Sequence, residues 1–193
     1  MQTNKTAIIM GANSDIGVQV SSRLLRDGWN VEGFLPRPWE VQPWDMMIFT
    51  IGRIRPIGKF MELDEAEWDD CVWSNALLPL SVLRSWYPHR RPDARVFFFD
   101  GPNLSQPTPT YSAYRAGKAI LAAVVPTLNA EYPDTQFTLL HTGPVRTKLH
   151  QQTLNAGNRA ANYERVLGIV DGREKTTSYD EIYRMIVPEL AVA

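Results

Sequence analysis

Short apolar runs alternate with helical patterns along this chain, and this alternation restricts the possible folds more than any other feature. Strands that are apolar on both faces are typical of a parallel sheet that helices cover on both sides. Right-handed crossovers would connect such strands. We therefore predict an α/β, Rossmann-like doubly wound sheet in a single domain over residues 1–193. The runs are Lys5–Met10, Trp29–Leu35, Met46–Ile51, Arg95–Phe99 and Gln136–His141.

Helical patterns lie between and after these runs. The first spans Asp15–Arg26 and stops before Gly28, a residue type that commonly ends helices. Pro79 should bend the long helix at Asp64–Tyr87, because proline removes a backbone donor and clashes with the preceding turn. The other predicted helices are Tyr111–Glu131 and Tyr179–Val187.

Composition excludes several classes of function. The formal net charge is −1 and the basic residues are dispersed, so no nucleic-acid partner is expected. The only cysteine is Cys71, which rules out an intramolecular disulfide, and three scattered histidines give no metal-ligand spacing. No apolar stretch reaches about 18 residues and the first residues do not resemble a signal peptide. We expect a cytoplasmic protein with no membrane partner and no metal.

The first strand–helix turn is a candidate phosphate-binding loop. It runs from Gly11 through Asn13 and Ser14 to Gly17. In open parallel sheets, ligands bind beyond the carboxyl ends of the strands, and the N–H groups and dipole of the next helix attract a phosphate. A glycine-rich turn is weak evidence by itself, and a plain strand–helix connection is the alternative.

Tyr114 and Lys118 form a candidate acid–base pair. Positions i and i+4 lie on the same face of a helix, so the Lys118 ammonium can approach the phenol. A free tyrosine has a pKa of about 10, and a nearby cation lowers that pKa. The same spacing also arises by chance, with a half-buried tyrosine beside a solvated lysine.

Four motifs together resemble the short-chain dehydrogenase/reductase family in order and spacing, over roughly Thr6–Leu149. They are Gly11-x-x-x-Asp15-x-Gly17, Asn75 in the long helix, Tyr114-x-x-x-Lys118, and the run Thr142-Gly143-Pro144-Val145-Arg146-Thr147. The resemblance implies a Rossmann-type fold that binds NAD or NADP and interconverts an alcohol and a carbonyl. It also implies a homodimer or homotetramer that pairs the two long helices, with a small alcohol or carbonyl as substrate.

The resemblance implies roles for the matched residues. Tyr114 would be the general acid/base, Lys118 would lower the pKa of that phenol and bind the nicotinamide ribose, and Asn75 would hold a water that relays protons. Cofactor contacts would come from Gly11, Asn13, Ser14, Ile16, Gly17, Gly52, Gly143, Val145 and Thr147, together with Tyr114 and Lys118.

The family's catalytic serine, expected thirteen residues before Tyr114, is replaced by Gly101. Loss of one transition-state hydrogen bond typically costs about 10²–10³ in rate. Asn103 and Ser105 are candidate substitutes, and an ordinary turn over Asp100–Asn103 is the alternative. The second hypothesis is therefore a weak or inactive relative that binds a nucleotide or a partner protein.

Asp15 stands where the family has the middle glycine of the phosphate turn. We expect its carboxylate to cap the following helix. It would also repel a pyrophosphate and compete for the same N–H donors, so Asn13 and Ser14 are the better cofactor contacts.

The chain is also shorter than the family's usual length. Only about ten residues separate Leu35 from Met46, too few for a strand and a crossover helix. One βα unit is therefore missing, and no final strand is evident after Val187. The predicted sheet has five strands, in the order 2-1-4-5-6 in the family's strand labels.

Two surrounding segments bear on ligand choice. After the second strand, Leu35-Pro36-Arg37-Pro38 offers Arg37 and no acid, which favours the extra phosphate of NADP over NAD, although Arg37 can equally be a solvated loop residue. Ala156–Val170 falls where the family has its variable substrate loop. Leu149, Leu154 and Tyr163 could cover a substrate there, and a surface excursion is the alternative.

Overall fold

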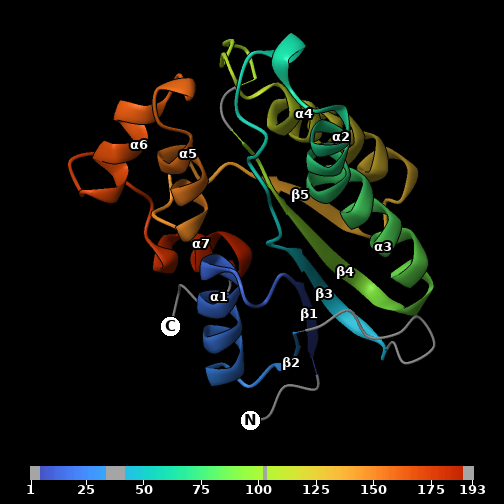
Figure 1. The fold of residues 1–193 in the computed structure, drawn as a ribbon. Coiled ribbons are helices and arrows are strands. Elements are labelled where there is room, and N and C mark those ends of the chain that lie inside the picture. Colours follow the sequence, from blue (N-terminus) through green and yellow to red (C-terminus); the bar gives the residue numbers. More distant parts are fainter. Residues whose placement is uncertain (1–4, 34–41, 102–103, 189–193) are drawn as a thin grey trace.

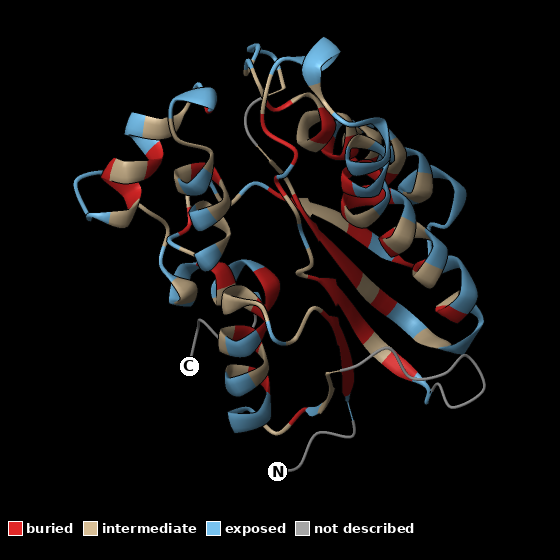
Figure 2. Cartoon of the chain, in the orientation of Figure 1, coloured by how far each residue is buried: buried red, intermediate tan, exposed pale blue. Residues whose placement is uncertain are grey.

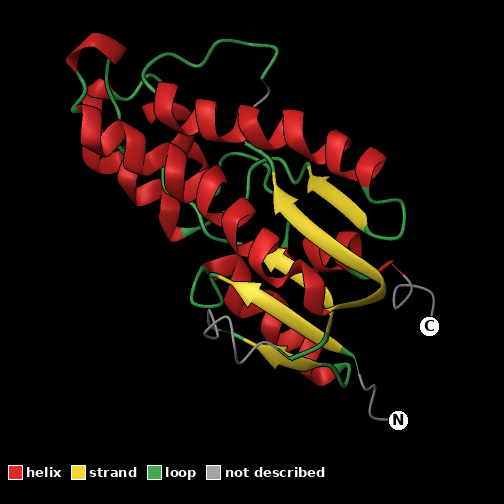
Figure 3. Ribbon diagram, turned by 90° about the vertical axis from the view of Figure 1, so that its right-hand side faces the viewer, coloured by secondary structure: helices red, strands yellow, loops and turns green. Residues whose placement is uncertain are grey.

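The computed structural model describes residues 5–33, 42–101 and 104–188. Its five strands form one sheet in the order β2-β1-β3-β4-β5, and every neighbouring pair is parallel (Figure 3). The predicted fold class and strand order are confirmed, because the family's strands 4, 5 and 6 correspond to β3, β4 and β5. The strands are β1 (Thr6–Met10), β2 (Asn30–Glu32), β3 (Trp44–Phe49), β4 (Arg90–Phe99) and β5 (Gln136–Leu140).

Helices cover both faces of the sheet (Figure 1). The helices α2 (Glu65–Val72), α3 (Leu78–Trp86) and α4 (Ser112–Glu131) lie on one face, and α1 (Asp15–Arg26) and α7 (Tyr179–Ile186) lie on the other. Two short helices, α5 (Gln151–Ala156) and α6 (Tyr163–Val170), stand beyond the carboxyl ends of the strands. None of the described helices is both long and apolar enough to span a membrane.

Alternate residues of each central strand enter two separate core layers. The central strands are buried along most of their length (Figure 2). In β4, for example, Val96 and Phe98 pack with Leu121 of α4, whereas Phe97 packs with Leu24 of α1 and Ile182 of α7. Successive side chains of a strand point to opposite faces, so a strand that is apolar throughout is buried only when both faces are covered. This explains why the apolar runs identified the sheet.

The long helix predicted at Asp64–Tyr87 is divided into α2 and α3. Between them the segment Trp73–Leu77 has π-helical hydrogen bonding, and the N–H of Leu78 donates to the carbonyl of Trp73, five residues back. Pro79 lies in the first turn of α3 and has no N–H to offer to the carbonyl of Asn75, four residues before it. The interruption therefore begins before the proline, and Asn75 lies in the widened turn.

Candidate functional site

A cavity of about 800 Å³ opens at the carboxyl ends of β1, β3, β4 and β5. This is where ligands bind in open parallel sheets, and the volume is in the usual range of about 300–1,000 Å³ for ligand pockets. The loops after these strands line one part of the cavity, and α4, α5 and α6 line the rest. The structure brings together along it Gly11, Asn13, Ser14, Ile16, Gly52, Tyr114, Lys118, Gly143, Val145 and Thr147.

The backbone of the first turn explains its two glycines. Gly11 has φ +94°, and a Cβ there would lie within 2.8 Å of the Ile51 nitrogen. A Cβ on Gly17 would lie 2.2 Å from the Gly11 carbonyl oxygen. Gly17 is buried beneath the turn and does not line the cavity, so it lets α1 pack closely against the loop.

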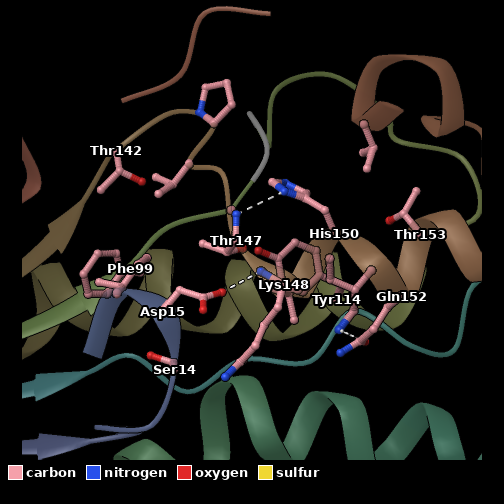
Figure 4. Close-up of a pocket in the computed structure, with 18 of the residues that line it drawn as sticks. Ser14, Asp15, Phe99, Tyr114, Thr142, Thr147, Lys148, His150, Gln152 and Thr153 are labelled. Carbon is pink, nitrogen blue, oxygen red and sulfur yellow. Dashed lines mark hydrogen bonds between the residues drawn. The ribbon is translucent and has the colours of Figure 1, made fainter. Parts of the chain in front are cut away.

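Ser14, not Asp15, caps α1. The Ser14 Oγ accepts a hydrogen bond from the N–H of Gly17 at 2.9 Å. The prediction that Asp15 caps the helix is wrong, because Asp15 is already the first helical residue. Its Oδ2 instead accepts the N–H of Lys148 at 2.5 Å (Figure 4). The Lys148 Nζ donates to the carbonyl of Asn13 at 2.9 Å.

Tyr114 and Lys118 lie side by side at the centre of the cavity wall. The Lys118 Nζ is 5.6 Å from the centroid of the Tyr114 ring and donates to the Phe99 carbonyl at 2.7 Å. Lys118 is buried, whereas Tyr114 is only partly buried and lines the cavity. The end of β4 therefore anchors the lysine, and the phenol remains beside the space that a ligand would occupy.

The electrostatic setting of the pair differs from the expected one. Burial lowers the pKa of Lys118 to about 8, and the nearby Asp100 carboxylate opposes that shift. Burial raises the pKa of Tyr114, and Asp100 raises it further. Burial and the Asp100 carboxylate oppose the lowering of the phenol pKa that was expected from Lys118, and the net shift is upward.

Asn75 does not line the cavity. Its buried Nδ2 donates to the carbonyls of Arg53 at 2.7 Å and Cys71 at 2.8 Å, and its Oδ1 accepts the N–H of Arg53 at 3.3 Å. A Cβ on Gly117 of α4 would lie 2.8 Å from the Asn75 Cβ, so the two helices approach closely at this point. Asn75 thus holds the loop after β3 in place through the main chain of Arg53.

Asp100 is a site residue that the sequence reasoning did not select. It lines the cavity, its side chain is 13% exposed, and its Oδ2 lies 2.5 Å from the Nδ1 of the exposed His141. Its Oδ1 also accepts the N–H of Gly101 at 2.7 Å. An acidic residue directly after a buried parallel strand was the available signal, since that is where such sheets place functional groups.

The remaining predicted residues lie elsewhere. Arg37 and Asn103 fall outside the described residues, and Ser105 is exposed and does not line the cavity. Leu149 lines the cavity, whereas Leu154 does not and Tyr163 packs in a small apolar cluster with Tyr111. The sequence reasoning also missed polar residues of the α5–α6 wall, namely Gln152, Thr153, Asn162 and Arg165.

Comparison with known proteins supports the resemblance. No family model matches the sequence. An uncharacterized oxidoreductase of Schizosaccharomyces pombe is 25% identical over 118 residues, which are 61% of this chain and 48% of that protein. The match therefore spans about half the length of that curated relative.

Solved structures match over almost the whole chain. The KRED1-Pglu enzyme has a TM-score of 0.81 at 16% identity, covering 98% of this chain and 95% of that one. A small-chain dehydrogenase in complex with NADPH has a TM-score of 0.80 at 12% identity, covering 97% and 91%. A short-chain dehydrogenase family protein from Francisella tularensis has a TM-score of 0.78 at 13% identity, covering 96% and 90%. The chain therefore has the fold of short-chain dehydrogenases/reductases.

Proposed function

We propose that this chain, which has the short-chain dehydrogenase/reductase fold, is an NADP-dependent oxidoreductase that interconverts a carbonyl and an alcohol. The observation that carries the proposal is the position of Tyr114 beside the buried Lys118, in the same cavity as the glycine turn before α1. The weak relative is named an oxidoreductase, and some structural neighbours are NADPH complexes, which supports a nicotinamide cofactor.

The cavity volume of about 800 Å³ supports a ligand of dinucleotide size. Gly143 lines it and has φ +67°, and a Cβ there would meet nothing nearer than the Thr177 hydroxyl at 3.7 Å. A Cβ on Gly52 would likewise have only ordinary contacts, the nearest at 3.5 Å. Because neither glycine carries a side chain, both leave space in the cavity. Gly11, Asn13, Ser14 and Ile16 would hold the phosphates, Gly52, Gly143, Val145 and Thr147 the nicotinamide part, and Arg37 the extra phosphate of NADP.

Tyr114 is suited to give a proton to the substrate oxygen. Its raised pKa keeps the phenol protonated near neutral pH, as a general acid requires. The chemistry that a bound reduced nicotinamide supplies is a hydride for the carbonyl carbon. The carbonyl oxygen takes the Tyr114 proton, which yields the alcohol and a phenolate. The Lys118 ammonium, charged below about pH 8, stabilises that phenolate.

Asn75 acts in this proposal as a positioning residue. Three hydrogen bonds of its side chain are to the main chain of Arg53 and Cys71, and a fourth is to the Cys71 Sγ at 3.4 Å, so Asn75 orients the loop that contains Gly52 and Ile54. Any proton relay through Asn75 would use its main-chain carbonyl, which receives no α-helical hydrogen bond because residue 79 is proline.

A second candidate function is a catalytically weak protein that binds a nucleotide or a partner. Two observations favour it: the position of the family's serine is occupied by Gly101, and the Asp15 carboxylate lies in the phosphate turn. The two candidates differ in turnover, which the following experiment measures.

The test is a titration of NADPH and NADH by nicotinamide fluorescence, with the wild-type protein and Arg37→Ala. We expect NADPH to bind more tightly than NADH, and Arg37→Ala to remove that preference. A panel of carbonyl substrates follows, with Tyr114→Phe as the control. No binding of either dinucleotide at millimolar concentration would exclude the oxidoreductase, and activity that survives Tyr114→Phe would remove Tyr114 from its assigned role.

We also propose that the protein is a homodimer or homotetramer. Trp73 is 47% exposed and Leu77 is 41% exposed, one turn apart on the segment between α2 and α3, which supports an apolar contact there. Light scattering after size-exclusion chromatography would measure the mass of wild type and of Trp73→Glu. A monomeric wild type at micromolar concentration would contradict the proposal.

A further inference from the structure

We infer that Asp15 limits the affinity of this site for a dinucleotide, because its carboxylate stands in the first turn of α1, where it would repel the ligand's pyrophosphate, and holds the Lys148 N–H. Lys148, which now binds the Asp15 carboxylate through its N–H, would bind the pyrophosphate in its place. This inference rests on the proposed function and concerns how the site binds its cofactor.

Two hydrogen bonds join the turn after β1 to the loop after β5, and Figure 4 shows the one between Asp15 and Lys148. The Asp15 Oδ2 accepts the N–H of Lys148 at 2.5 Å, and the Lys148 Nζ donates to the Asn13 carbonyl at 2.9 Å. Asn13, Asp15 and Lys148 all line the large cavity. The bonds therefore bridge two walls of the space into which a dinucleotide would have to fit.

The bridged region is the region that a pyrophosphate needs. At a helix start the first N–H groups have no intrahelical acceptor, and with the helix dipole they attract an anion. In Rossmann-type turns the pyrophosphate binds there. Here the Asp15 carboxylate lies in the first turn of α1 and accepts the Lys148 N–H, so a dinucleotide would meet like charge at the helix start and an occupied donor on the facing loop.

Lys148 would act in the opposite sense to Asp15. Its N–H and its ammonium are both committed to residues of the phosphate turn. If a pyrophosphate displaces the carboxylate, the same two donors become available to phosphate oxygens, which are strong acceptors for charged donors. Removing the Asp15 charge should therefore strengthen binding, and removing the Lys148 ammonium should weaken it.

The test compares NADPH dissociation constants of wild type, Asp15→Asn and Asp15→Ala by nicotinamide fluorescence. Asp15→Asn removes the charge and keeps the size of the side chain. We expect at least about tenfold tighter binding, equivalent to 1.4 kcal/mol. Adding Lys148→Met to Asp15→Asn should weaken binding again by about fivefold, a modest effect because the ammonium is exposed. Asp69→Asn is the matched control, since it removes the same charge from an exposed position on α2.

Each outcome decides the inference. Tighter binding by both Asp15 variants, with Asp69→Asn unchanged, supports it, including the case in which only the variants bind. Equal or weaker binding by Asp15→Asn overturns it. If no protein binds NADPH, the proposed function is wrong, and calorimetry with inorganic pyrophosphate decides the inference by the same comparison.

Amide hydrogen exchange gives a readout without any ligand. The Lys148 amide should exchange faster in Asp15→Ala than in wild type, because the variant lacks the acceptor. Equal exchange rates at Lys148 in the two proteins would mean that the bond does not form in solution, and the inference would be wrong.

Discussion

The side chain of Lys118 fills the space that a side chain at position 101 would need. A Cβ on Gly101 would lie 2.7 Å from the Lys118 Cγ, 3.2 Å from its Cβ and 3.5 Å from the Tyr114 Cε1. The first distance is to the inner part of the lysine, which the helix backbone holds and which cannot swing away freely. The absence of the family's serine is therefore coupled to the way in which the lysine is packed.

We predict that Gly101→Ser neither restores a serine function nor leaves stability unchanged. Overpacking of a close contact typically costs about 1–3 kcal/mol, and the variant should lose stability in that range because Lys118 must shift. Urea unfolding would measure it, with Gly52→Ala as the control, since a Cβ at Gly52 meets its nearest neighbour at 3.5 Å. A fully stable Gly101→Ser protein with faster carbonyl reduction would contradict this prediction.

The second prediction concerns Asp100 and the charge state of Lys118. The Asp100 carboxylate raises the pKa of Lys118 against the larger effect of burial, and the result is a pKa of about 8. Asp100→Asn should therefore lower the Lys118 pKa further, so that the amine is neutral over more of the physiological range. NMR titration of the lysine ¹³Cε resonances would follow it, with Asp69→Asn as the control. An unchanged or higher Lys118 pKa would show that Asp100 is not its counter-ion.

The effect of Lys118 on stability should depend on pH, and its sign follows from the same pKa. The folded-state pKa of about 8 lies below 10.5, the ordinary pKa of a lysine in water. The unfolded state therefore binds more protons between those two values, and stability from this group rises with pH across that window. Below about pH 8 both states are protonated and the whole cost of burying the charge is present.

Lys118→Met tests this directly. Near pH 7 the variant should gain up to about 3 kcal/mol from the removed charge, at about 1.4 kcal/mol per pKa unit, less the cost of leaving the Phe99 carbonyl without its donor. The difference from wild type should shrink between pH 8 and pH 10.5. Urea unfolding at several pH values would measure it, and a difference that does not vary with pH would refute the prediction.

The sheet and most residues of the cavity wall could be predicted from the sequence, because they follow from local patterns along the chain. Burial in β4 requires both faces to be apolar, and that pattern is local, so Arg95–Phe99 was readable as a strand. Tyr114 and Lys118 share one helix, and their proximity follows from the helical repeat alone.

The charge interactions and pKa shifts of the site could not be predicted from local sequence patterns. The bond between Asp15 and Lys148 joins residues 133 positions apart, and its existence depends on how the loop after β5 returns to the turn after β1. The influence of Asp100 on Tyr114 depends on the depth of both groups beneath the surface. Burial of the phenol, together with a nearby carboxylate, raises the Tyr114 pKa where a lowered pKa was expected, and no spacing along the chain reveals it.

The last prediction separates the stability role of Asn75 from its role in the site. Asn75 makes hydrogen bonds to main-chain groups of Arg53 and Cys71 while buried, so Asn75→Ala should cost about 2–4 kcal/mol through a cavity and unpaired groups. Asn129 is the control, because its side chain bonds both the N–H and the carbonyl of Phe137, away from the cavity. Asn129 is exposed, so Asn129→Ala should lose less stability, about 0.5–1.5 kcal/mol. Only Asn75→Ala should also weaken NADPH binding, since it releases the loop that holds Gly52 against the cavity. Equal NADPH affinity in the two variants, measured where both are folded, would limit Asn75 to a structural role.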